Sequence, residues 1–119
     1  MLHHVALEIR PSEIDRSVEL WEIAGFERVA EPEPLQGRFV WLERGSTQIH
    51  LALVDEPVAP EVGHAAAVAE GLDGVVERLE QAGFEVFEKS SLWGERRVGV
   101  IAPAGHRVEL MEAPPDPIV

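Results

Sequence analysis

The sequence predicts an α+β fold in which two tandem β-α-β-β-β modules form a cupped mixed sheet around a central site. The tetrapeptide AGFE occurs twice, at 24–27 and 82–85. Each copy ends a helical segment and precedes three strand-like runs. Matching residues keep nearly the same offset, which is 60 from His4 to His64, 58 from Gly25 to Gly83 and 59 from His50 to Glu109. An offset that persists from first strand to last indicates an internal duplication.

Module one is predicted to span residues 1–54. The run HVALEI (His4–Ile9) alternates apolar and other residues, as a half-buried strand does. The segment PSEIDRSVELWEIAGF predicts an amphipathic helix, with Ser12 as a candidate N-cap and Gly25 at its end. The runs FERVAE, RFVWLE and TQIHLALV follow, with Pro and Gly between them, and predict three strands.

Module two is predicted to span residues 64–112. Its first strand, HAAAVA, has weaker strand propensity because of its alanines. LDGVVERLEQAGF predicts the second helix, with Asp73 as a candidate cap, and FEVFEK, RRVGVIA and HRVELME predict three strands. Residues 55–63 contain two prolines and a glycine and predict a linker. Residues 113–119 predict an irregular Pro-rich tail, and the whole chain, 1–119, a single domain.

Composition excludes several classes of function. Acidic residues number 22 against 10 basic ones, for a net charge of −12, which argues against binding to nucleic acid. The absence of Cys excludes disulfides, thiolate ligands and cysteine nucleophiles. No run of eighteen apolar residues predicts a membrane span, and the N-terminal stretch lacks the pattern of a signal peptide. We therefore expect a cytoplasmic protein.

Strand alternation predicts which side chains point away from the face of the sheet that the helix covers. In HVALEI the apolar residues pack under the helix, so His4 faces the other way. The same parity places His50 and Glu109 on that open face, and His64 matches His4 in the second module. Imidazole and carboxylate groups are good ligands for Zn, Fe, Ni, Co or Mn. The pattern therefore predicts a site for a divalent metal ion of unknown identity.

The chain resembles the vicinal oxygen chelate superfamily, which includes glyoxalase I, methylmalonyl-CoA epimerase, fosfomycin-resistance transferases, extradiol dioxygenases and bleomycin-resistance proteins. HVALEI, the helix ending in AGF, QIHL, GHAAAVAE and GHRVELME carry the resemblance. It implies that His4, His50, His64 and Glu109 hold a divalent ion that binds a chelating oxygenated substrate. It also implies a homodimer, and leaves open whether the site forms within one chain or across two.

The resemblance has departures that leave the reaction open among lyase, isomerase and dioxygenase chemistry. Glyoxalase I-like proteins usually carry Glu, and epimerase-like proteins Gln, where this chain has His50. Glu109 is then the remaining carboxylate of the set, and His50 is a second candidate base if it does not bind the metal. His4, His64 and Glu109 alone form a triad suited to Fe(II) and oxygen chemistry. The absence of Tyr weakens the ring-cleavage hypothesis.

Phe39, Trp41, Trp93 and Arg97 are the candidate walls of a substrate pocket. Core, dimer-contact or solvated positions are the alternative for each of them. A metal-free protein that binds a small molecule, of the bleomycin-resistance type, is the competing function, since a charge of −12 and the aromatic residues suit a cationic drug. A module that kept the fold and lost the chemistry is a third possibility.

Overall fold

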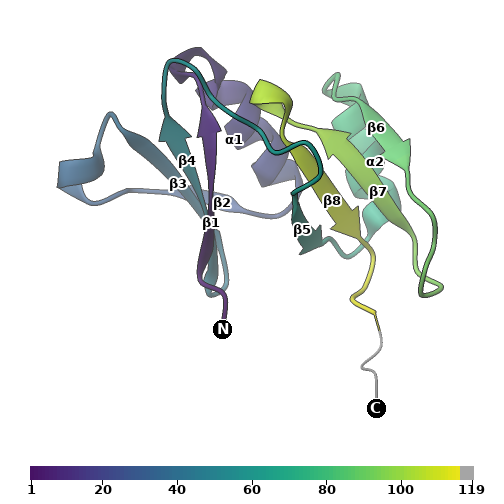
Figure 1. Cartoon of the computed structure of the whole chain (residues 1–119). Coiled ribbons are helices and arrows are strands. Elements are labelled where there is room, and N and C mark those ends of the chain that lie inside the picture. Colours follow the sequence, from purple (N-terminus) through teal and green to yellow (C-terminus); the bar gives the residue numbers. More distant parts are fainter. Residues whose placement is uncertain (116–119) are drawn as a thin grey trace.

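A computed structural model describes residues 1–115 of the 119-residue chain, and it confirms the predicted α+β fold with two modules (Figure 1). Module one contains β1 (His4–Ile9), α1 (Ile14–Ile23), β2 (Glu27–Val29), β3 (Phe39–Arg44) and β4 (Thr47–Leu53), with short 3-10 turns at Pro11–Glu13 and Glu33–Leu35. Module two contains β5 (Ala65–Val68), α2 (Leu72–Gln81), β6 (Val86–Glu88), β7 (Arg97–Ile101) and β8 (Arg107–Met111), with a 3-10 turn at Pro103–Gly105.

Each module forms one four-stranded mixed sheet, and the two sheets have the same topology. The strand orders are β1-β4-β3-β2 and β5-β8-β7-β6. In both sheets the first strand is parallel to the last, and the other neighbours are antiparallel. The identical order and direction confirm the duplication that the repeated AGFE indicated.

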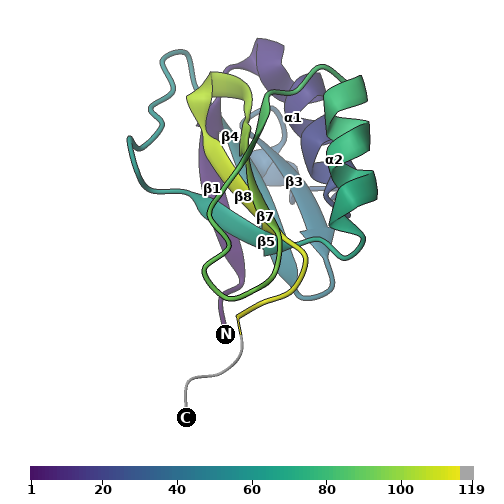
Figure 2. The ribbon, with the colours of Figure 1, turned by 90° about the vertical axis from the view of Figure 1, so that its right-hand side faces the viewer.

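The helices lie on the same side of the two sheets, as Figure 2 shows, and they contact one another. The apolar stripe of α2 is buried at Leu72, Val75, Val76 and Leu79. Buried residues of both modules belong to one hydrophobic cluster, so the modules share a core. With the helices on one side, the opposite face of each sheet is open, and this is the face on which the candidate ligands were predicted.

The AGFE repeats end the two helices in the same way. Gly25 has φ +100° and Gly83 has φ +85°, the left-handed conformation that a helix C-terminus favours in glycine. The phenylalanine after each glycine is buried, Phe26 at 5% and Phe84 at 7% exposure. The repeat is therefore a helix stop followed by a core anchor.

Two arginines tie the modules together at these helix ends. Arg16 of α1 donates to the carbonyl of Ala82 at 2.7 Å, and its guanidinium lies 3.7 Å from the centre of the Phe84 ring. Arg44 donates to the carbonyls of Ala24, at 3.1 Å, and of Val68, at 2.6 Å. The hydrogen bonds satisfy carbonyls near helix and strand ends, and each arginine makes at least one contact with the second module.

The predicted helix caps were wrong. Ser12 lies inside the 3-10 turn before α1, and it makes no capping hydrogen bond. The N-cap of α2 is Gly71, in the left-handed conformation, rather than Asp73. The carboxylate of Glu112, at the end of β8, accepts from the backbone N–H groups of Gly71 at 3.2 Å and Leu72 at 2.7 Å. Glu112, which is distant in the sequence, therefore caps α2 in place of a local side chain.

Residues 113–115 form no helix or strand, as expected for the tail, and residues 116–119 lie outside the described part of the chain. Within the described residues, neither helix has the length and apolar character required to cross a membrane.

Candidate functional site

The open face of the first sheet carries a stack of three aromatic rings, which we call the first half-site: Trp41 on β3, His50 on β4 and His4 on β1. Trp41 and His50 are directly opposite in the antiparallel β3–β4 pair. Their rings are 4.1 Å apart and 2° from parallel. The rings of His50 and His4 follow at 4.0 Å and 20°. His50 is thus held between an indole and a second imidazole.

The environment of His50 keeps its imidazole neutral. Only 7% of the residue is exposed. Burial, followed by repulsion from His4 and then His3, lowers the pKa of His50 from its ordinary value of 6.5 to about 4. A neutral imidazole has one free lone pair, which is what a metal ligand needs. A base with so low a pKa is weak at neutral pH, so this environment suits a ligand better than a proton acceptor.

Two further side chains continue from His50 across the sheet. The Nε2 atom of His50 lies 2.7 Å from Oε1 of Gln48. The Nε2 atom of Gln48 in turn donates to Oε2 of Glu43 at 3.3 Å. Gln48 and Glu43 face each other in the β3–β4 register, two pairs beyond Trp41 and His50 and therefore on the same face of the sheet. Three polar side chains therefore run in a line away from the ring stack.

The open face of the second sheet carries the second half-site, which centres on the buried carboxylate of Glu109 on β8. Arg97 on β7 donates from Nη1 to Oε1 of Glu109 at 2.7 Å. Nζ of Lys89 lies 3.6 Å, and Nε2 of His64 3.8 Å, from the same oxygen. Glu109 is 5% exposed. Three groups that carry or can carry positive charge thus surround one carboxylate.

A small cavity of about 160 Å³ adjoins this carboxylate, and Phe87 and His64 are among its walls. The ring of Phe87 covers Gly99, which is opposite Glu109 in the β7–β8 register. Trp93, in the loop before β7, lies 5.2 Å from the guanidinium of Arg97. The second half-site therefore combines fixed charges with an aromatic rim.

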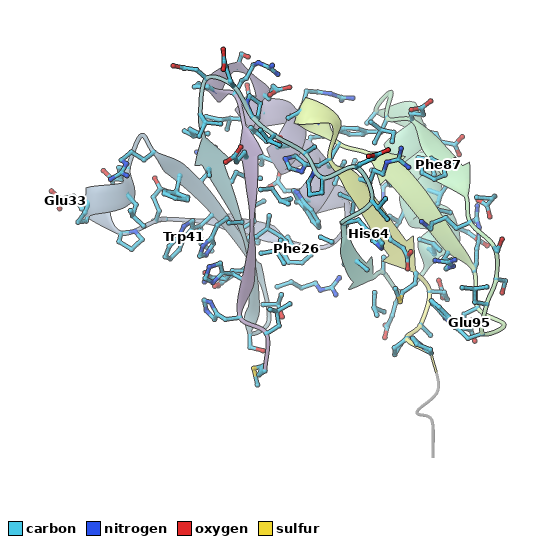
Figure 3. All side chains as sticks on the ribbon, viewed as in Figure 1. Phe26, Glu33, Trp41, His64, Phe87 and Glu95 are labelled. Carbon is cyan, nitrogen blue, oxygen red and sulfur yellow. The ribbon has the colours of Figure 1, made fainter. Side chains whose placement is uncertain are left out.

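The predicted ligands fall into two pairs. His4 lies beside His50, and His64 lies beside Glu109. Among residues 1–115, no group of three or more His, Asp or Glu side chains converges closely enough to hold an ion. Figure 3 shows Trp41 on the first sheet and His64 beside the second. The donor atoms have the chemistry that a divalent ion prefers, but each half-site contributes only two of them.

The predicted pocket residues also divide between the half-sites. Trp41 belongs to the first, and by strand alternation Phe39 lies on the same open face, opposite Ala52. Arg97 and Trp93 belong to the second half-site. Among the indole nitrogens of the described residues, Nε1 of Trp41 and of Trp93 are buried without a hydrogen-bond partner.

Sequence reasoning missed Gln48, Lys89 and Phe87. Gln48 lies two residues before His50 in the sequence, and Phe87 lies two residues before Lys89. The period of two in a strand places such residues on one face, so alternation applied to every polar or aromatic neighbour could have found them. The pairing of Lys89 with Glu109 depends on the β6–β7 and β7–β8 registers, which the sequence does not give.

Together these features define a class: a duplicated β-α-β-β-β protein with His and Glu side chains on the open faces of its two sheets. Solved structures with a similar fold include a Bacillus anthracis protein described as a member of the glyoxalase family, with TM-score 0.81, 25% identity and 93% of each chain covered. The fosfomycin resistance protein FosX of Listeria monocytogenes is similar too, with TM-score 0.76, 18% identity and coverage of 96% of this chain and 91% of that one.

An antibiotic-binding protein, TnmS3 of a Streptomyces species, has TM-score 0.69 and 17% identity over 93% of each chain. No protein-family model and no curated protein matches the sequence. The structural neighbours belong to the vicinal oxygen chelate superfamily. The chain therefore has the fold of that superfamily, and the resemblance seen in the sequence is confirmed.

Proposed function

We propose that this protein is a metal-dependent enzyme that acts on a small oxygenated substrate able to chelate the ion. The observation that carries the proposal is the division of four ligand-type residues into two pairs, one on each open face. Two ligands are too few for a stable centre of this kind. We infer that a homodimer completes it, with His4 and His50 of one chain and His64 and Glu109 of the other.

In this arrangement each residue has a distinct task. His4, His50 and His64 supply imidazole nitrogens, and Glu109 supplies one carboxylate. A bound divalent ion would act as a Lewis acid toward the substrate oxygens or would activate dioxygen. Four ligands on an octahedral ion leave two positions, enough for one chelating substrate. Arg97 holds Oε1 of Glu109, so Oε2 is the oxygen left to bind the ion or to accept a proton.

Charge favours an anionic substrate. Arg97 and Lys89 are fixed cations beside a single carboxylate, and the imidazole of His50 is neutral. Adding a divalent cation makes the site more positive. Enolates, catecholates and hydroxy acids therefore fit better than cationic molecules. The reaction, whether lyase, isomerase or dioxygenase, and a cytoplasmic location stay predictions.

Metal content of the purified protein, measured by elemental analysis after reconstitution with Fe(II), Ni, Co, Mn or Zn, tests the proposal. We expect about one ion per chain in the wild type, since a twofold dimer has two equivalent sites. His4→Ala and His64→Ala should each lose it. Failure of the wild-type protein to retain any of these ions would refute the metal-dependent function.

Co-expression of the two variants tests where the site forms. If the centre joins two chains, a mixed dimer has one intact site and one site lacking both histidines. Random pairing should then restore about a quarter of the wild-type metal content, because half of the dimers are mixed and each has one good site of two. If the centre forms within one chain, mixing restores nothing, and the dimeric site is excluded.

One observation favours a metal-free binding protein as the second candidate. The Trp41–His50–His4 stack offers a flat aromatic surface, and the indole Nε1 of Trp41 is a buried donor without a partner among the described residues. TnmS3, which has the same fold, is an antibiotic-binding protein. Quenching of tryptophan fluorescence by planar cationic compounds, in chelator-treated protein, would support this function, and its absence in Trp41→Leu would locate the site.

A further inference from the structure

Glu43, Gln48 and His50 form a chain of hydrogen bonds whose direction is determined at one end. The carboxylate of Glu43, when ionised, can only accept a hydrogen bond. The amide nitrogen of Gln48 must therefore face Glu43, at 3.3 Å. This leaves the amide oxygen of Gln48 facing His50. Only one orientation of the Gln48 amide satisfies both neighbours.

The hydrogen bond between Gln48 and His50 determines which ring nitrogen of His50 carries a hydrogen. An amide oxygen accepts hydrogen bonds and donates none, and Nε2 of His50 lies 2.7 Å from it. Nε2 must therefore carry the hydrogen. A neutral imidazole carries only one ring hydrogen, so Nδ1 then carries none. The lone pair of His50 is then on Nδ1.

We propose that Gln48 and Glu43 are positioning residues that hold His50 in its Nε2–H tautomer, so that His50 presents Nδ1 as its only lone pair. Stacking against Trp41 and His4 fixes the plane of the ring, and Gln48 fixes its rotation within that plane. Hydrogen bonds to the second nitrogen of a ligating imidazole set the tautomer and the ligand's basicity. The role in metal binding rests on the proposed function, whereas the tautomer does not.

The proposal is tested first on the metal-free protein, by long-range ¹H–¹⁵N correlation NMR of the histidine side chains. The chain has five histidines, and loss of one signal in His50→Gln assigns the relevant ring. We expect the wild type to show the Nε2–H form of His50. Gln48→Leu should convert it to a mixture of both tautomers, because no acceptor then selects one of them.

A reversed pair of side chains separates positioning from packing. In the double variant Glu43→Gln with Gln48→Glu, the carboxylate at position 48 accepts from His50 and from the amide at position 43. We expect the Nε2–H form to return in this variant, although Gln48→Leu lost it. Gln36→Leu, at an exposed position in module one, is the matched control and should leave His50 unchanged.

Metal affinity is the second readout. Gln48→Leu should weaken binding by roughly 10- to 100-fold, and the reversed pair should restore most of it. An Nδ1–H form of His50 in the wild type, or an unchanged tautomer in Gln48→Leu, would overturn the proposal. A wild-type protein that binds no metal would refute the proposed function and leave the tautomer result intact, so the two failures are distinguishable.

Discussion

Arg97 and Glu109 form an ion pair at 2.7 Å in which both side chains are largely withdrawn from water, with 13% and 6% of their surfaces exposed. The strands β7 and β8 bring them together within the second half-site. Such a pair contributes little against an apolar replacement of both partners, but removing one partner leaves a buried charge. Removing Arg97 alone should therefore destabilise the protein more than removing the charges of both partners.

Arg97→Met should lower the free energy of unfolding by about 2 kcal/mol. A fully buried pair would lose roughly 3–5 kcal/mol, and Lys89, at 3.6 Å from the same carboxylate oxygen, compensates in part. Urea denaturation at neutral pH measures the loss. Adding Glu109→Gln to Arg97→Met should recover stability, because the orphaned charge is then gone. A double variant less stable than Arg97→Met would contradict this account.

The pH dependence of stability should show the lowered pKa of His50. The unfolded chain protonates His50 below its ordinary value of 6.5, whereas the folded protein resists protonation until about pH 4. Between these values the unfolded state binds more protons, so the free energy of unfolding falls as the pH falls. The loss is complete below about pH 4, and for this residue it amounts to at most about 3 kcal/mol.

Thermal and urea unfolding between pH 4 and pH 7.5 tests this prediction. His50→Phe keeps a ring that can stack on Trp41 and removes the titrating group, so its stability should fall less steeply over the same range. The other titrating groups are common to both proteins, and the difference in slope isolates His50. Equal slopes would show that His50 does not resist protonation in the folded state.

Gly99 has room for no side chain, because a Cβ atom added there would collide with the ring of Phe87. Gly99→Ala should displace that ring from the cavity beside Glu109 and cost about 1–3 kcal/mol, as overpacking does. Phe87 is 37% exposed, so Phe87→Ala should cost less. Unfolding experiments on both single variants and the double variant measure how far the two residues interact.

The double variant Gly99→Ala with Phe87→Ala should be more stable than Gly99→Ala alone. Gly74→Ala is the control, since an added Cβ there meets no atom within 4 Å and lies within α2. It should raise the stability by about 0.4–1 kcal/mol. If Gly99→Ala behaves as Gly74→Ala does, the contact with Phe87 does not constrain position 99.

Most of the architecture could be predicted from the sequence because the duplication repeats local signals. Gly25 and Gly83 marked both helix ends, and strand alternation placed His4, His50 and Glu109 on the open faces. These are short-range properties of the chain. The helix starts could not be predicted in this way, because α2 is capped by Glu112, which is forty residues away from Leu72 in the sequence.

The candidate site was predicted as a set of ligand-type and pocket residues, without the contacts between them. Alternation gives the face of a residue but not its neighbours across strands, so it could not show that Arg97 and Lys89 share Glu109 with His64. Nor could it show that His50 stacks between Trp41 and His4. Such contacts depend on strand register and side-chain rotamers, which the tertiary structure determines.

Glu112, which directly follows β8, should contribute more to the free energy of unfolding than an exposed residue without such contacts. Its carboxylate accepts from the N–H groups of Gly71, at 3.2 Å, and Leu72, at 2.7 Å, and so satisfies donors at the start of α2. A negative charge also interacts favourably with the positive end of the helix dipole. Glu112→Ala should therefore cost about 1–2 kcal/mol, whereas Glu112→Gln, which keeps one acceptor, should cost less.

Glu77→Ala is the matched control for this prediction, because Glu77 is exposed within α2 and its loss should change stability by less than about 0.5 kcal/mol. Urea unfolding gives the stabilities, and amide hydrogen exchange at Leu72 reports the local opening of the helix start. We expect faster exchange there in Glu112→Ala and wild-type exchange in Glu77→Ala. Equal effects of the two substitutions would mean that β8 does not cap α2, and that the tie between the last strand and the second helix adds nothing to the module.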